Sequence, residues 1–346
     1  MLKKPNFIVI ALAGLIIFSI SLYSFANADN EEKKLREISI GFYNVENLFD
    51  TFDDPEKDDD EFLPSSDREW TPERYTDKVV KLSTVISKLG NSLPTIVGLC
   101  EVENKDVVVD LTKSNALKKG NYGIVHYDSP DMRGIDVGLI YRKDNFKVIY
   151  SKPIAVNLPE PERPTRDILY VKGKVKRGPE LHIFVNHWPS RWGGADESEF
   201  KRIIAAGTLK TNIDSIIGTD PDAMIISMGD FNDYPYNKSI SKILDADSLN
   251  SSSTLVNLMA GLEKEHRGSY NYRGDWGFLD QIIVTRTLTD NEIPDIVSSS
   301  TKPYFFEEMV YIDENYGDVK PNRSYGGTTY YAGYSDHLPV YTILKY

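Results

Sequence analysis

Apolar residues recur along the chain in short runs and in helical spacing, which predicts strands interleaved with helices. Strands are expected at residues 37–43, 95–101, 122–127, 135–142, 146–156, 167–175, 180–187, 222–229, 278–285 and 337–344. Helices are expected from Thr71-Pro72-Glu73 to Gly90, over 104–119 and over 197–217. Some strands follow one another as hairpins and others alternate with helices. The pattern therefore favours an α/β protein with mixed sheets over a doubly wound parallel sheet.

The first 28 residues have the layout of an export signal. Lys3 and Lys4 precede an apolar stretch over residues 7–25, and Ala26-Asn27-Ala28 provides a small-x-small cleavage site. We expect a signal peptide at 1–28 and a mature protein at 29–346 that is periplasmic or extracellular. The apolar stretch is nearly long enough to span a bilayer, so an uncleaved N-terminal membrane anchor is the alternative. In either case the rest of the chain lies outside the cytoplasm.

Composition indicates a globular protein, because 40% of the 346 residues are hydrophobic and 27% are charged. We find no repeat and no long linker, so residues 29–346 are expected to form one domain. The net charge of −12 lacks the basic footprint of a stable DNA-binding protein. It is compatible with a nuclease, because a bound metal ion can supply local positive charge. The single cysteine, Cys100, lies in an apolar run and is expected to be a buried thiol, and the oligomeric state is left open.

Polar side chains stand at the ends of several predicted strands. These segments contain Asn44, Glu101, Asn186-His187, Gly229-Asp230-Phe231-Asn232 and Ser335-Asp336-His337. Ligand sites in layered α/β proteins form where such strand ends converge. A single strand-end Asp is commonly a turn former, but five such segments are hard to explain as separate turns.

These side chains suit the hydrolysis of a phosphate ester. The carboxylates of Glu101, Asp230 and Asp336 are the hard oxygen ligands that Mg²⁺ or Mn²⁺ prefers, with Ca²⁺ as a further possibility. The imidazoles of His187 and His337 can contact phosphate or transfer protons. The amides of Asn44 and Asn232 can orient water or a phosphate oxygen without adding negative charge.

The sequence resembles the endonuclease/exonuclease/phosphatase superfamily, which includes deoxyribonuclease I, apurinic/apyrimidinic endonucleases, bacterial sphingomyelinases and inositol-polyphosphate 5-phosphatases. The matching motifs stand in the family's order, from Phe42-Tyr43-Asn44-Val45 through "LCEVEN", "VNHW", "GDFND" and "FLDQIIV" to "SDHLPV" at 335–340. The resemblance implies a four-layer α/β sandwich of two packed mixed sheets flanked by helices, with the site at one end.

The resemblance also implies a role for each matching residue. Glu101 would be the main metal ligand, supported by Asn44 and Asp336. Asp230 would orient or deprotonate the attacking water, and Asn232 would position the water or the phosphate. His337 would contact phosphate or transfer a proton while Asp280 holds its second nitrogen, and His187 would stabilise the transition state or protonate the leaving oxygen. Asp136 would be the acidic partner of His187, and Arg166 would contact phosphate. Glu46 is a further candidate for the metal shell.

Two segments near these motifs have two interpretations each. The loop with Trp188, Arg191 and Trp192 either faces the substrate, where it could stack a base, or is a structural loop anchored by tryptophan. The acidic segment 50–61 lacks the glycine and the spacing of a Ca²⁺ loop, which favours a solvated loop.

Three functions fit the sequence to different degrees. The first is a metal-dependent phosphodiester hydrolase, an endonuclease with DNA or RNA as substrate. The second is a phosphodiesterase or phosphatase acting on phospholipid or inositol phosphate, and the catalytic residues do not separate it from the first. The third is a non-catalytic surface binding protein, and the complete polar set argues against it. Membrane contact is expected only through an uncleaved N-terminal segment.

Overall fold

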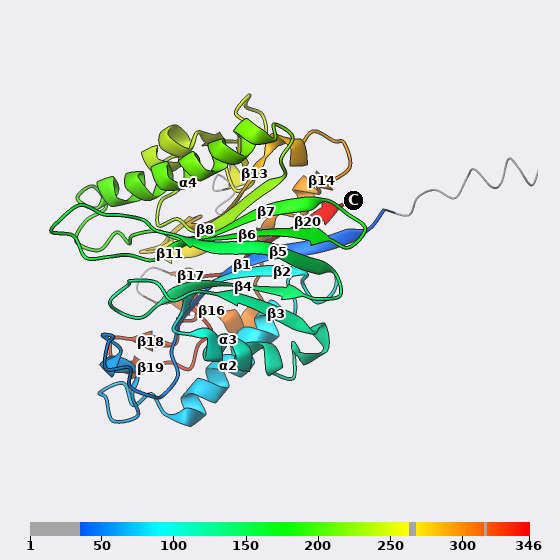
Figure 1. Cartoon of the computed structure of the whole chain (residues 1–346). Helices are drawn as coiled ribbons and strands as arrows, with labels where there is room; N and C mark the ends of the chain where they lie inside the picture. The colour runs from blue at the N-terminus through cyan, green and yellow to red at the C-terminus, as the bar shows by residue number, and fades with distance from the viewer. Residues whose placement is uncertain (1–34, 263–267, 315–316) are drawn as a thin grey trace, which may run out of the picture. The chain divides into compact units, whose positions relative to one another are not determined.

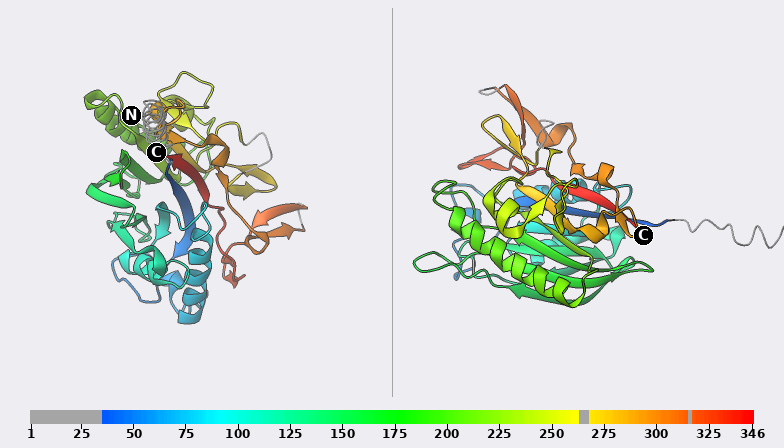
Figure 2. Two further views of the ribbon diagram at one scale, coloured as in Figure 1. Left: turned by 90° about the vertical axis from the view of Figure 1, so that its right-hand side faces the viewer. Right: turned by 90° about the horizontal axis from the view of Figure 1, so that it is seen from above.

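The computed structural model of the protein describes residues 35–262, 268–314 and 317–346, and Glu37–Tyr346 form one compact unit. In this unit two sheets pack face to face between outer helices, as Figure 1 and the two views of Figure 2 show. Helices α2 (Pro72–Ile86) and α3 (Lys105–Lys113) cover one sheet, and α4 (Glu199–Thr219) covers the other. The predicted four-layer α/β sandwich with mixed sheets is confirmed.

Each of the two sheets has seven strands within the described residues. The first sheet has the order β14-β20-β1-β2-β4-β3, with β15 also paired to β20; its strands are β1 (Glu37–Leu48), β2 (Ile96–Val102), β3 (Tyr122–His126), β4 (Asp136–Arg142), β14 (Asp295–Ile296), β15 (Lys302–Pro303) and β20 (Val340–Lys345). The second sheet has the order β5-β6-β7-β8-β13-β10-β9; its strands are β5 (Phe146–Ile154), β6 (Ile168–Val175), β7 (Glu180–His187), β8 (Ile225–Asp230), β9 (Ala246–Asp247), β10 (Leu255–Asn257) and β13 (Asp280–Thr285).

Smaller elements complete the described fold. Three two-stranded hairpins are β11 (Tyr270–Tyr272) with β12 (Asp275–Gly277), β16 (Val310–Asp313) with β17 (Asp318–Pro321), and β18 (Tyr325–Gly326) with β19 (Thr329–Tyr330). The short helical turns are Asp60–Phe62, Lys118–Gly120, Ser239–Leu244, Arg286–Leu288, Ser298–Ser300 and Glu307–Met309. No helix in the described part of the chain is both long and apolar enough to cross a membrane. The expected export segment 1–28 and its boundary with 29–346 lie outside the described residues.

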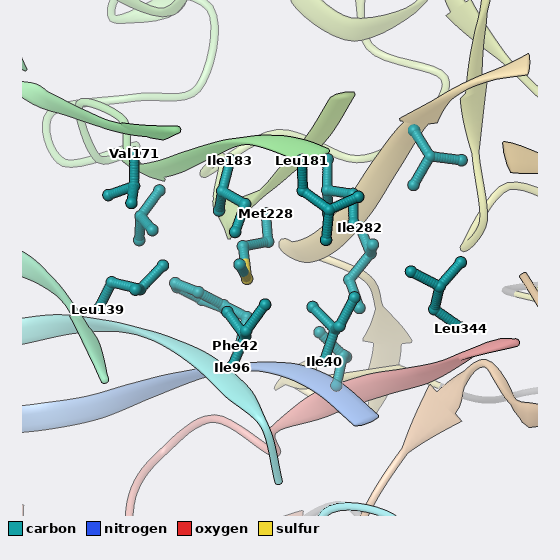
Figure 3. Packing of buried hydrophobic residues seen from close by; sticks show 14 of the residues in the cluster. Ile40, Phe42, Ile96, Leu139, Val171, Leu181, Ile183, Met228, Ile282 and Leu344 are labelled. Carbon is teal, nitrogen blue, oxygen red and sulfur yellow. The ribbon is translucent and has the colours of Figure 1, made fainter. Parts of the chain in front are cut away.

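Three apolar clusters hold the layers together. The central cluster lies between the two sheets, where Phe42 and Ile96 from one sheet face Ile183 and Met228 from the other (Figure 3). Cys100 belongs to this cluster and is buried, which confirms the prediction of a core thiol. A second cluster packs α2 and α3 on the first sheet, and a third packs α4 on the second. Burial of apolar surface on both faces explains why the sheet strands have near-continuous apolar sequences.

The predicted helix over 104–119 is too long, because α3 ends at Lys113. Ser114 and Asn115 follow at that point, and the side chains of Ser and Asn favour non-helical backbone because they compete for backbone hydrogen bonds. The short strands and hairpins between residues 245 and 335 were not predicted either. Most of them are two to four residues long, which is too short to establish a period in the sequence.

Strand pairing aligns the polar strand ends. β1 and β2 run parallel, so Asn44 lies opposite Cys100 and beside Glu101. In the second sheet, His187 at the end of β7 pairs with Asp230 at the end of β8, and Asp230 pairs with Asp280 at the start of β13. Both sheets therefore bring their polar ends to the same end of the sandwich.

Candidate active site

Asp230 lies at the centre of a buried polar cluster that joins the two sheets. Its Oδ2 is 3.1 Å from Asn44 Nδ2, and the same amide nitrogen lies 3.2 Å from Glu101 Oε1. The Nε2 atoms of His187 and His337 lie 3.8 Å and 3.9 Å from Asp230 Oδ2. The structure thus brings together five of the residues that the sequence predicted, from both sheets.

The backbone around these residues is held in uncommon conformations. Glu101, Asn232 and Glu46 have φ angles of 61°, 50° and 50°, in the left-handed region that side chains other than glycine rarely adopt. Hydrogen bonds hold two of them: Asn47 N donates to Glu101 Oε2 at 2.9 Å, and Asn232 N donates to Asp230 Oδ1 at 2.9 Å. Backbone strain of this kind is characteristic of functional sites, where the surrounding structure maintains it.

His337 has the acidic partner that was predicted for it. Its Nδ1 lies 2.7 Å from Asp280 Oδ2, and both side chains are buried. Burial alone would lower the pKa of His337, but Asp280, Asp230 and Asp336 outweigh this effect and raise it well above its usual value. His337 is therefore the positively charged imidazole of the site, suited to contact a phosphoryl oxygen.

His187 is in the opposite electrostatic situation. Burial lowers its pKa well below the usual value, and the charges of Arg166 and Arg133 lower it further. Its Nδ1 is buried and has no hydrogen-bond partner among the described residues. His187 is therefore the neutral imidazole, placed 3.8 Å from Glu101 Oε1 as well as from Asp230.

The predicted pair between Asp136 and His187 is not formed. Asp136 Oδ2 lies 3.1 Å from His126 Nε2 instead, and Asp136 Oδ1 accepts a hydrogen bond from Ser129 N at 2.8 Å. The reason is topological: β3 and β4 are antiparallel neighbours at the edge of the first sheet, which brings His126 next to Asp136. His187, by contrast, lies at the end of β7 in the second sheet, and its Nε2 faces Asp230 and Glu101.

Arg166 lies close enough to His187 to influence its pKa, but its terminal nitrogens bind the protein. One Nη is 2.9 Å from Asp131 Oδ2, and the other donates to the carbonyl oxygen of Trp188 at 2.6 Å. Asn232 Nδ2 donates to the same carbonyl at 2.9 Å. Arg166 is therefore connected to Asn232 through one shared acceptor, and its contact with phosphate stays a prediction.

Asp336 lies at the more exposed rim of the cluster, beside a residue that the sequence did not suggest. The guanidinium of Arg323 lies 3.4 Å from Asp336 Oδ2 and 3.6 Å from Glu46 Oε1, and its side chain is 47% exposed. Burial and then the charge of Glu46 raise the pKa of Asp336 to about 6. Arg323 precedes β18 in a segment without apolar period, so no pattern in the sequence could have indicated it.

Glu46 is bound to the protein through both carboxylate oxygens. Oε2 accepts from Ser324 N at 2.7 Å and lies 3.5 Å from Lys78 Nζ, while Oε1 faces Arg323. Lys78 is itself buried in α2 and also donates to Ser324 Oγ at 2.6 Å. These contacts favour a role for Glu46 in joining β1, α2 and the segment before β18.

We expect Lys78→Ala to lower the free energy of unfolding by about 3 kcal/mol, because it removes the buried cation of the Glu46 carboxylate and leaves only the half-exposed Arg323 beside it. Urea denaturation followed by circular dichroism measures the effect. The matched control is Lys210→Ala, which removes the partner of Asp214 in a solvent-exposed i,i+4 pair on α4 and should cost about 0.5 kcal/mol or less. Equal stability of the two variants would contradict the assignment of a buried ion pair.

The loop after β7 was predicted either to face the substrate or to be a structural loop anchored by tryptophan, and its two tryptophans differ in this respect. Trp188 is buried, its Nε1 donates to Asn186 Oδ1 at 3.2 Å, and its ring meets Phe231 edge-on at 4.7 Å. Trp188 is thus the structural anchor. Trp192, by contrast, is 91% exposed and is free to face a substrate.

The donor set fits a divalent metal ion. Asp230 and Glu101 share a buried site with an acidic excess, and burial raises the pKa of Asp230 to about 7, partly offset by His337. Such carboxylates gain most from a bound cation, and their oxygens suit Mg²⁺, Mn²⁺ or Ca²⁺. Two groups of potential ligands among the described residues have ligating atoms within 4.8 Å of one another: Asp230, Asp280 and His337 in this cluster, and His126, Asp128 and Asp136 around the end of β3. Because His337 Nδ1 and Asp280 already bind each other, we favour Glu101 with Asn44 as the ligands.

Comparisons with known proteins identify the family of the chain. The profile of the Endonuclease/Exonuclease/phosphatase family matches residues 39–346, whereas no curated protein sequence matches the chain. Among solved structures, a humanized D. rerio TDP2 has a TM-score of 0.53 and 16% identity, covering 89% of this chain and 98% of that one. The human Nocturnin catalytic domain has a TM-score of 0.52 and 16% identity, covering 90% and 97%.

A third solved structure is similar to the same extent. The mannosyl-6-phosphatase of Bacteroides thetaiotaomicron has a TM-score of 0.51 and 16% identity, covering 89% of this chain and 99% of that one. At this level of identity the three structures support the fold alone. The family profile extends over most of the chain, and the protein belongs to the endonuclease/exonuclease/phosphatase family.

Proposed function

We propose that the protein is a divalent-metal-dependent phosphodiesterase that cleaves DNA or RNA internally. The observation that carries the proposal is the convergence of Asp230, Glu101 and the two imidazoles of His187 and His337 at one end of the sandwich. Family membership supports phosphoester hydrolysis as the chemistry. The sequence of residues 1–28 supports action outside the cytoplasm, where a nuclease can degrade nucleic acid for uptake.

Glu101 and Asn44 would hold the metal ion, with Asp336 at the rim of the same site. The bound ion would offset negative charge on the phosphoryl oxygens. Asp230 accepts from Asn44 and from the backbone of Asn232, which fixes the carboxylate in a position to orient the attacking water. His337, held by Asp280, contributes a positive charge to the phosphoryl group, and neutral His187 can donate a hydrogen bond to the leaving oxygen, which takes its proton from solvent water.

Internal cleavage of nucleic acid is tested by incubating the full-length protein and Mg²⁺ or Mn²⁺ with covalently closed plasmid DNA, RNA, sphingomyelin and an inositol phosphate. We expect nicked and then fragmented plasmid or shortened RNA, because a closed circle has no end from which an exonuclease could start. Hydrolysis confined to sphingomyelin or inositol phosphate would favour the alternative substrate class. Asp230→Asn protein, prepared in the same way, controls for contaminating nucleases because it lacks the carboxylate assigned to the water.

A further inference from the structure

We propose that a strip of four tyrosines beside His337 stacks the unpaired bases of a single nucleic-acid strand. The aromatic strip consists of Tyr270 and Tyr272 of β11 and of Tyr234 and Tyr236, which follow β8. The inference rests on the proposed function and extends it, because it predicts that a single strand is cleaved faster than a duplex of the same sequence.

The strip begins at the reaction centre. The ring of Tyr270 lies 4.8 Å from the ring of His337, centroid to centroid, with an angle of 37° between the planes. Tyr272 is two residues further along the same strand, so its side chain leaves β11 on the same face as that of Tyr270. Tyr272 is 54% exposed, so a base could reach its ring from solvent.

Close packing at Gly277 brings the second pair of tyrosines to that face. Gly277 in β12 is the direct cross-strand partner of Tyr270, and directly opposed residues in an antiparallel pair project to the same side. A Cβ atom at Gly277 would lie 2.3 Å from Cε1 of Tyr234, so the glycine leaves the space in which the Tyr234 ring rests. The ring of Tyr236 stacks on that of Tyr234 at 5.5 Å and 29°, and Tyr236 is 66% exposed.

Two guanidinium groups accompany the rings. Arg191 lies 4.4 Å above the ring of Tyr234, and it is held there by Asp233 Oδ1 at 3.2 Å and by hydrogen bonds to the carbonyl of Asn232 at 2.9 Å and to Asn237 Oδ1 at 2.8 Å. Arg323, whose side chain is 47% exposed, lies 3.4 Å from Asp336 Oδ2, and Asp336 directly precedes His337, the residue whose ring faces Tyr270. Aromatic rings interleaved with cations are the composition of surfaces that bind single strands, where bases stack and phosphates meet positive charge.

The charge of the chain favours an unpaired strand over a duplex. A duplex keeps its bases stacked inside and presents phosphates, so its binding requires an extended basic surface. The net charge of −12 argues against such a surface, whereas stacking on tyrosine depends on ring faces more than on net charge. The strip is also entirely tyrosine, with a polar hydroxyl on every ring, which suits bases better than acyl chains.

The experiment compares Tyr236→Ala, Tyr272→Ala and the double variant in the full-length protein with Mn²⁺. The substrates are a single-stranded DNA oligonucleotide, the blunt duplex of the same sequence, and bis-p-nitrophenyl phosphate. We expect each substitution to lower kcat/KM on the single strand by about 5- to 150-fold, which corresponds to about 1–3 kcal/mol of base stacking.

Activity on bis-p-nitrophenyl phosphate should stay unchanged, and Tyr236→Phe should retain wild-type activity because the ring remains. The matched control is Tyr150→Ala, a tyrosine on β5 that is 53% exposed.

Binding provides a readout that does not depend on catalysis. Fluorescence anisotropy of a labelled oligothymidylate in EDTA should show weaker binding by the double variant than by wild type or Tyr150→Ala. Equal binding by all variants, an equal loss of activity on single strand and duplex, or a loss confined to bis-p-nitrophenyl phosphate would each overturn the proposed role of the strip. Failure to hydrolyse bis-p-nitrophenyl phosphate together with normal oligothymidylate binding would instead overturn the proposed catalytic function and leave the strip intact.

Discussion

Replacement of either imidazole, in His187→Ala or His337→Ala, is expected to lower kcat on bis-p-nitrophenyl phosphate by about 10²–10⁴-fold. This is the range for loss of a group that transfers a proton or stabilises charge in the transition state. The Nε2 atoms of the two rings lie 3.8 Å and 3.9 Å from Asp230 Oδ2, the atom at the centre of the cluster, so each ring is placed to act on a phosphoryl group bound there. Steady-state kinetics on variants with an unchanged circular dichroism spectrum measure the effect.

The partners of the two imidazoles make the prediction sharper. Because Asp280 binds His337 Nδ1 at 2.7 Å, the two act as a unit, and Asp280→Asn combined with His337→Ala should be little worse than His337→Ala alone. Asp136→Asn should affect kcat far less than Asp280→Asn, because Asp136 binds His126 and Ser129 and not His187.

The control for the imidazole variants is His182→Gln, which replaces a histidine in the middle of β7 that bonds to Tyr170. If His187→Ala and His337→Ala both keep the full kcat of the folded protein, the assignment of these residues to catalysis is wrong.

Removal of divalent metal is the second large effect, and we expect exhaustive dialysis against EDTA to abolish hydrolysis. Mg²⁺ or Mn²⁺ should restore it, because buried carboxylates with raised pKa values need a cation to stay ionised beside a phosphate. Glu101→Gln should weaken Mn²⁺ binding, measured by the EPR signal of free Mn²⁺, by more than the roughly 10–100-fold that loss of an outer-shell partner costs.

Asp60→Asn tests whether the ion binds instead to the acidic segment 50–61. Asp60 is exposed in that segment, so its substitution should leave Mn²⁺ affinity and activity unchanged. Undiminished activity after EDTA dialysis, or a larger loss of Mn²⁺ affinity in Asp60→Asn than in Glu101→Gln, would contradict the site at Glu101.

The spacing of apolar residues along the chain was sufficient to predict most of the long strands and helices. The strand predicted at 180–187 is β7 with the same bounds, and the helix expected from Thr71 begins at Pro72 with the Thr71 side chain accepting from Arg74 N. Such features depend on apolar period and on capping residues a few positions apart, which are visible in the chain itself. Predicted helix ends were less accurate, because α2 ends at Ile86 before the expected stop at Gly90, and α3 ends at Lys113.

The motifs at the strand ends also located the cluster, because a residue at the end of a buried strand has its position determined by that strand. Asn44, Glu101, His187, Asp230 and His337 come together as the sequence suggested. The acidic partner predicted for His187 was wrong. Which acidic residue lies beside an imidazole depends on which strands are neighbours, and because β3 pairs with β4, Asp136 lies beside His126.

By itself, then, the sequence of this protein determined the layered α/β class, the family motifs and the residues at the reaction centre, since each is encoded over a few consecutive positions. Tertiary structure alone decided the surroundings of that centre. Lys78 reaches Glu46 from 32 residues away, Arg323 reaches it from 277, and Gly277 admits the ring of Tyr234. Contacts between residues so far apart follow from how the sheets, helices and hairpins pack, and no local period or motif in the chain records them.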